Sequence, residues 1–274
     1  MPDSALSRVL RRDRWVMIGT MLALAAFCWV YLICLAGAMP AMNAGPMRDM
    51  PGMSMTAASA LAPKIAPWTA THALFMFGMW AVMMVGMMTP SVAPMILIYM
   101  QVARRGATID RPFAPAGWFA LGYLSAWTLF AALATAAQWG LESLALLTPM
   151  MASANRSFGG AILLGAGIYQ WLPVKDACLT MCRSPLSFVQ RHGGFQPTAR
   201  GSLRLGLLHG RYCLGCCWAL MAALFTVGVM NLLWIALLMM LVLLEKLLPW
   251  GSTLARVAGL VAAANGVLML VRGP

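Results

Sequence analysis

Long runs of apolar residues, separated by short polar connections, dominate this chain. About 20 apolar residues form a helix long enough to cross the hydrocarbon core of a bilayer. The pattern therefore predicts an all-α fold, a polytopic transmembrane helix bundle of about seven spans, near residues 15–38, 73–100, 116–139, 157–173, 204–230, 231–248 and 253–271. The apolar run from Leu214 to Leu248 would overshoot the bilayer as one helix, so we place a tight turn near Asn231. A six-span arrangement stays open.

Composition excludes a soluble protein. Hydrophobic residues make up 62% of the 274 residues and charged residues only 9%, with a mean hydropathy of +0.80, so polar surface is too scarce to cover a soluble domain. The net charge of +12 suggests nucleic acid, but the 19 Lys and Arg are scattered between apolar runs and form no dense basic patch. We therefore expect the lipid bilayer as the surroundings and no nucleic-acid partner.

The basic residues indicate the orientation, because short cytoplasmic loops carry an excess of Lys and Arg. They are frequent before the first span and in every second connection after it, and sparse in the others. This alternation predicts a multi-pass protein of the inner (cytoplasmic) membrane with a cytoplasmic N-terminus and, for seven spans, an outward C-terminus. We expect three parts: a basic N-terminus with a first span (1–38), an outward loop (39–72) and the membrane bundle (73–274). The first span is expected to be a retained anchor, since secretory apolar segments usually run only about 7 to 15 residues; a signal peptide cleaved after Ala36-Gly37-Ala38 is the alternative.

Three cysteines lie close together at the start of the fifth predicted span, in the segment Tyr-Cys-Leu-Gly-Cys-Cys-Trp. On a helix, Cys213, Cys216 and Cys217 fall within one arc of about 100°. His209, four residues earlier, joins the edge of this face if the helix already runs there. Free cysteine also packs as a small hydrophobe, but three in five positions favour a shared chemical role.

A second cysteine pair, Cys178 and Cys182, follows the Pro173 that should end the fourth span. Its spacing fits one helical face, and the topology puts it on the same side of the membrane as the first group. That side is reducing, which favours thiolate ligation or redox exchange over a structural disulfide, with plain packing as a further alternative. Positive charge that would favour thiolates is available from Lys175, Arg183 and Arg211, or from a bound cation.

Ligand softness limits the choice of metal. Sulfur-only ligand sets select Cu(I), Zn(II) or iron–sulfur clusters, whereas hard ions need carboxylates, and the chain has only seven acidic residues. Two short Cys-rich segments resemble a zinc site, so Zn(II) stays open as the metal. Two methionine patterns favour Cu(I).

The first pattern is a Met-rich segment of the outward loop, interrupted by Pro and Gly. Thioethers bind Cu(I) without deprotonation, so this segment is a candidate for outward metal capture, through Met39, Met42, Met47, Met50, Met53 and Met55. The second pattern is a helical stripe in the second span, either an in-membrane path for a soft cation or ordinary packing, formed by Met76, Met79, Met83 and Met87. We also expect Glu245 and Lys246, near the end of the sixth span, to pair at the cytoplasmic interface.

Three segments carry a resemblance to a known family. They are Trp80–Ser91 (Trp-Ala-Val-Met-Met-Val-Gly-Met-Met-Thr-Pro-Ser), Tyr169–Lys175 running into Cys178 and Cys182-Arg183, and Gly210–Met221. The chain resembles bacterial proteins described as predicted metal-binding integral membrane proteins with a domain of unknown function. The resemblance implies a membrane protein that binds metal, and the Met-rich outward segment lies outside it.

The sequence thus indicates an integral membrane protein that binds a soft metal, Cu(I) before Zn(II), and hands it over at or across the membrane. The predicted ligands are Cys178, Cys182, Cys213, Cys216 and Cys217, with His209 as a possible addition. A metal donor or acceptor protein is the expected partner. Nothing resembles an ATPase, and no enzyme class is indicated. A membrane thiol–disulfide redox protein and an assembly factor with structural cysteines are the alternatives.

Overall fold

The computed structural model describes residues 5–44, 68–105, 113–148 and 150–272. This part of the chain is helical and contains no strand, which confirms the predicted all-α fold. Its helices are α1 (Ala5–Ala44), α3 (Ala70–Arg105), α4 (Phe113–Ser143), α5 (Arg156–Tyr169), α6 (Pro173–Arg183), α7 (Pro185–Arg191), α8 (Ala199–Ala222), α9 (Leu224–Val227), α10 (Leu232–Leu247) and α11 (Gly251–Val271).

Five segments in the described residues are long and apolar enough to cross a membrane. They lie at Trp15–Gly37, Ala70–Val102, Pro115–Ser143, Ala199–Val227 and Gly251–Val271. Helices also form at the two remaining predicted spans, but α5 and α10 have only 14 and 16 residues. At 1.5 Å per residue they are about 21 and 24 Å long, short of the roughly 30 Å hydrocarbon core. The span count stays a prediction.

Some element boundaries differ from the predicted ones. α1 continues to Ala44, six residues beyond the predicted end, through a segment rich in the good helix formers Ala and Met. The connection after the fourth predicted span is not an open loop but holds α6 and α7. The turn near Asn231 is confirmed: the Asn231 side chain caps α10 by accepting a hydrogen bond from the Trp234 N–H at 3.0 Å.

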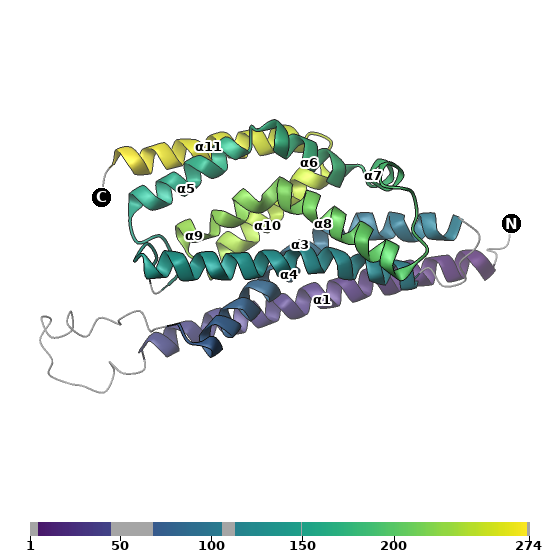
Figure 1. The fold of residues 1–274 in the computed structure, drawn as a ribbon, viewed down its shortest axis with the longest axis horizontal. Coiled ribbons are helices and arrows are strands. Elements are labelled where there is room, and N and C mark those ends of the chain that lie inside the picture. Colours follow the sequence, from purple (N-terminus) through teal and green to yellow (C-terminus); the bar gives the residue numbers. More distant parts are fainter. Residues whose placement is uncertain (1–4, 45–67, 106–112, 149, 273–274) are drawn as a thin grey trace, which may run out of the picture.

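The helices lie roughly side by side, with α8 and α10 between two outer groups (Figure 1). α1, α3 and α4 form one side, and the closely packed pair α5 and α11 forms the other. α6 and α7 lie at the end of the bundle where α1 begins, opposite to the end where α11 finishes (Figure 1). α8 therefore contacts both groups, and its buried face, which carries Cys213, Cys216 and Cys217, is turned to the interior of the bundle.

Glycines bring α4 and α8 unusually close together. A Cβ on Gly206 would lie 1.9 Å from the Phe119 carbonyl oxygen, and one on Gly122 would lie 2.1 Å from the Leu203 carbonyl oxygen. Small residues at such crossings let helix backbones approach in membrane bundles, where packing replaces the hydrophobic effect as the driving force. This crossing places Tyr123, the residue after Gly122, directly against the cysteine segment of α8.

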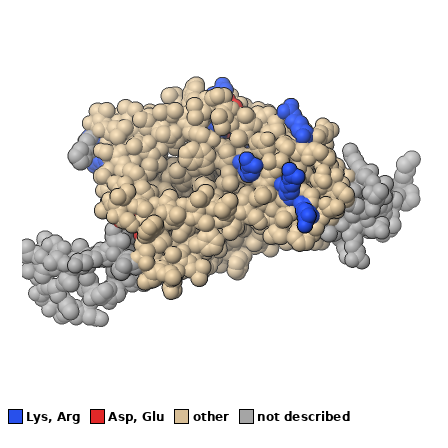
Figure 2. All heavy atoms as spheres, in the orientation of Figure 1, with Lys and Arg blue, Asp and Glu red and all other residues tan. Residues whose placement is uncertain are grey.

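Basic side chains gather at the end of the molecule that holds α7 and the start of α8 (Figure 2). The helices α6 to α8 contribute Arg183, Arg191, Arg200, Arg204 and Arg211. The remaining surface in this view is almost free of charge (Figure 2). The positive-inside rule expects such an asymmetry at a cytoplasmic end, and the orientation stays a prediction.

Candidate metal centre

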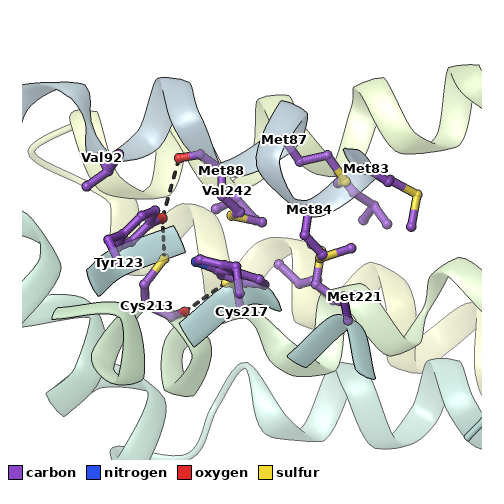
Figure 3. Close-up of a cluster of buried hydrophobic side chains, with 14 of the residues drawn as sticks. Met83, Met84, Met87, Met88, Val92, Tyr123, Cys213, Cys217, Met221 and Val242 are labelled. Carbon is purple, nitrogen blue, oxygen red and sulfur yellow. Dashed lines mark hydrogen bonds between the residues drawn. The ribbon is translucent and has the colours of Figure 1, made fainter. Parts of the chain in front are cut away.

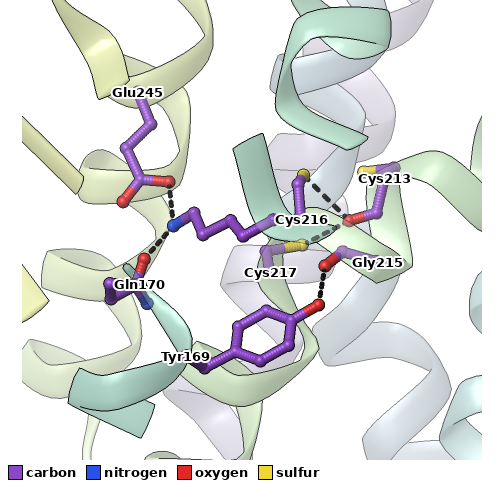
Figure 4. Close-up of polar contacts among 8 residues, drawn as sticks. Tyr169, Gln170, Cys213, Gly215, Cys216, Cys217 and Glu245 are labelled. Carbon is purple, nitrogen blue, oxygen red and sulfur yellow. Dashed lines mark hydrogen bonds and ion pairs between the residues drawn. The ribbon is translucent and has the colours of Figure 1, made fainter. Parts of the chain in front are cut away.

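Three buried thiols form the centre of the site on α8. The sulfur atoms of Cys213, Cys216 and Cys217 all lie within 4.8 Å of one another. Steps of three and four residues place them on one helical face, as the sequence predicted. The thiols of Cys216 and Cys217 donate to the Cys213 carbonyl oxygen, at 3.1 and 2.8 Å (Figure 4). Metal binding would therefore exchange weak internal hydrogen bonds for metal–sulfur bonds.

The second cysteine pair approaches this group from α6, but neither Cys178 nor Cys182 belongs to the set of sulfurs that all lie within 4.8 Å of one another. The Cys178 sulfur packs against Gly215, where an added Cβ would lie only 2.6 Å from it. The neighbouring thiols of Cys213 and Cys216, together with burial, hold the pKa of Cys182 well above its usual value. Burial, with Cys216 nearby, raises the pKa of Cys178. Two cysteine groups some thirty residues apart in the chain thus lie together in the fold.

Polar contacts on three sides hold α6 in place. Lys175 forms a buried ion pair with Glu245 of α10 at 2.8 Å and also donates to the Gln170 side chain (Figure 4). Arg183 donates to the carbonyl oxygens of Leu248 and Pro249, at 2.7 and 2.6 Å. A further ion pair joins α6 to α11, between Asp176 and Arg256 at 2.9 Å. The position of the α6 thiols therefore depends on α10 and α11.

The expected pairing of Glu245 with Lys246 is wrong. Adjacent helical residues point about 100° apart, so Glu245 reaches Lys175 while Lys246 points toward α8. The Lys246 ammonium lies 2.8 Å from the Cys213 sulfur and 3.1 Å from the Ser91 hydroxyl. The positive charge in contact with the thiols comes from this residue. The charged groups of Lys175 and Arg183 make the contacts given above, and Arg211 is exposed.

His209, the candidate additional ligand, lies one turn before Cys213 and is buried among aromatic rings. Its ring centroid is 4.9 Å from that of Phe188, 5.8 Å from Phe119 and 5.9 Å from Tyr123. Its Nδ1 has no hydrogen-bond partner among the described residues. The imidazole is not part of the group of sulfurs that lie within 4.8 Å of one another.

The methionine stripe of α3 lies inside the bundle. Met76, Met79, Met83 and Met87 are all buried, and the neighbouring Met84 points toward Met221 of α8, beside Cys217 (Figure 3). The Gln138 side chain contacts the Met76 sulfur at 3.6 Å. Two of the predicted capture residues, Met39 and Met42, fall in α1, where only the backbone is described. The other four lie outside the described residues: Met47, Met50, Met53 and Met55.

Two residues of the site were missed in the sequence. The Tyr123 hydroxyl lies 3.1 Å from the Cys213 sulfur. In the sequence this tyrosine lies within a long apolar run, where nothing distinguishes it from a residue that only packs. Ser91 follows a proline in α3, and its hydroxyl links Lys246 to the Met88 carbonyl oxygen. The one sequence signal that pointed here is Lys246, because an ionisable residue at the end of a long apolar run often marks function.

The buried thiol group contains no carboxylate, and methionine side chains share its apolar surroundings. Such a set of sulfur groups has the chemistry of a soft-metal site. The family of PpoB2 copper chaperones matches residues 77–269, and the chain belongs to this family. The matched region contains every predicted cysteine ligand and supports the metal-related part of the resemblance. No curated protein and no solved structure matches the chain.

Proposed function

We propose that this protein binds Cu(I) at the α6–α8 thiols and passes it to or from a partner protein at the inner membrane. The observation that carries the proposal is the mutual approach, within 4.8 Å, of three buried cysteine sulfurs in a copper chaperone family member. Cys178 and Cys182 add two thiols from a separate helix. His209 lies next to this group, and we keep it as an additional ligand only if its replacement lowers copper binding.

Cu(I) suits the surroundings better than Zn(II). Zinc sites are commonly tetrahedral and accept cysteine, histidine or carboxylate, whereas thioethers are ligands for Cu(I). The buried methionines Met84, Met88 and Met221 share the apolar cluster that contains the thiols. A Cu(I) ion leaving the cysteines toward these residues would meet soft thioether sulfur.

We further propose that the α3 stripe carries the ion through the bundle. Met76 and Met87 are eleven residues apart, which is about 17 Å along a helix and about half of the hydrocarbon thickness. Thioethers bind Cu(I) weakly and without proton exchange, so they allow release at each step. The Met39–Met55 segment would supply the ion from the outer side.

Metal content measures the proposal directly. Protein purified anaerobically in detergent and loaded with Cu(I) is expected to hold stoichiometric copper, and the Cys213→Ser/Cys216→Ser/Cys217→Ser variant almost none. Ser nearly preserves volume but is a poor ligand for a soft ion. Cys34→Ser is the matched control. It makes the same chemical change at a cysteine on the exposed face of α1, away from the site.

Full copper occupancy in the triple variant would remove the α8 thiols from the site. No metal in the wild-type protein, with thiols that cycle reversibly to a disulfide, would instead support the redox alternative. If the protein retained zinc in preference to copper under competition, the cysteines would still be the metal ligands, but the metal would be Zn(II) and not Cu(I).

The path has its own test. Met79→Leu/Met83→Leu/Met87→Leu replaces thioethers by side chains of similar volume, so the fold and the copper content of loaded protein should stay unchanged. Copper movement into vesicles that contain this variant should fall at least tenfold. Unchanged movement would make the stripe ordinary packing.

A further inference from the structure

Lys246 is a buried cation in direct contact with the cysteine cluster. It is the penultimate residue of α10, and only about a tenth of it is exposed. Its ammonium lies 2.8 Å from the Cys213 sulfur and 3.1 Å from the Ser91 hydroxyl. A lysine at such a position is costly unless a charge compensates it.

No carboxylate supplies that charge within the described part of the chain. Glu245, its neighbour in sequence, is directed to Lys175 by the buried 2.8 Å ion pair. The remaining described ion pair, Asp176 with Arg256, is elsewhere on α6 and α11. The groups that can balance Lys246 are therefore those of the cysteine cluster itself.

Charge counting then limits how the cluster can hold a metal ion. One Cu(I) with two thiolates carries a net charge of −1, and the Lys246 ammonium brings the buried assembly to zero. A third thiolate would leave −1, which is unfavourable in a medium of low dielectric constant. Neutral thiols or thioethers can still contact the ion without changing this sum.

We propose that Lys246 is the countercharge of this site and fixes its loaded form as one Cu(I) on two thiolates. The proposal rests on the Cu(I) binding proposed above. Lys246 is a specificity-determining residue that does not itself bind the ion: it acts through Cys213, and its fixed charge favours a Cu(I) dithiolate over the same ion with one or three thiolates.

Two pairs of variants test this by Cu(I) competition with a chromophoric chelator in detergent. Lys246→Gln removes the charge without adding a sulfur ligand and should weaken Cu(I) binding at least tenfold, whereas Lys246→Arg keeps the charge and should retain most of the affinity. Ser91→Asp leaves Lys246 in place but sets a carboxylate beside its ammonium. Compared with the uncharged Ser91→Asn, it should also weaken binding at least tenfold.

X-ray absorption of the copper-loaded wild-type protein adds a readout that does not depend on folding of a variant, and two short copper–sulfur bonds are expected. Equal affinities within each variant pair, or three equal short copper–sulfur bonds in the wild type, would overturn the role of Lys246 while leaving copper binding intact. Failure of the wild-type protein to compete for Cu(I) at all would instead reject the proposed function.

Discussion

Lys175 of α6 and Glu245 of α10 form an ion pair of 2.8 Å in which both side chains are almost completely buried. The second carboxylate oxygen of Glu245 has no partner among the described residues, so Lys175 is the main compensation for its charge. The pair also joins the helix that carries Cys178 and Cys182 to the body of the bundle. Its removal should therefore affect stability and the position of two thiols together.

Lys175→Met is expected to destabilise the folded protein by about 3–5 kcal/mol, because it leaves a buried carboxylate without its cation. The double variant Lys175→Met/Glu245→Gln should recover most of this loss, since both charges are then absent. Unfolding in mixed micelles measures the two free energies. A double variant no more stable than Lys175→Met would show that the pair acts through more than its charges.

Gly206→Ala should disrupt the α4–α8 crossing, because the added methyl group would lie 1.9 Å from the Phe119 carbonyl oxygen. The helices must separate, and Tyr123 would move away from Cys213. We expect a loss of at least about 2 kcal/mol in stability, as for other overpacked positions. Gly140→Ala on α4, the partner helix of this crossing, is the control: nothing lies within 4 Å of the added atom, so the change should be neutral or slightly stabilising. Similar unfolding curves for both variants would argue against tight contact.

His209→Leu should leave the copper content unchanged, because the imidazole packs on three aromatic rings. Removing its unpartnered Nδ1 should cost little stability. Copper per protein is measured beside the triple Ser variant of α8, which should lose the metal. A substantial loss of copper in His209→Leu would make this histidine a ligand.

The topology predicts opposite locations for the two chain ends. α1 begins at one end of the bundle and α11 finishes at the other (Figure 1), which fits an odd number of crossings. With a cytoplasmic N-terminus, alkaline phosphatase fused after Arg272 should be active in a bacterial host and a fluorescent protein fused there should be dark. A fluorescent fusion truncated after Arg191 is expected to be bright. The reverse pattern would invert the orientation and place the thiols on the oxidising side.

The sequence by itself determined the helical class, the approximate position of every long helix and the grouping of three cysteines on one face of α8. These follow from local properties: the length of apolar runs, the break at Asn231, and the spacing of Cys213, Cys216 and Cys217 on one helical face. The spacing of four residues between Cys178 and Cys182 likewise predicted that the two share one helical face. Local pattern gave the wrong partner for Glu245, because neighbours in sequence point to different sides of a helix.

Only the tertiary structure decided which charges and helices meet. The approach of α6 to α8 depends on Gly215, which leaves room for the Cys178 sulfur, and on contacts of Lys175 and Arg183 with residues some seventy positions later. Lys246 reaches Cys213 for the same reason: α10 packs beside α8 with this face inward. Such contacts arise from the packing of whole helices, in which glycines set the distance and side-chain direction selects the partner, and no local pattern contains that information.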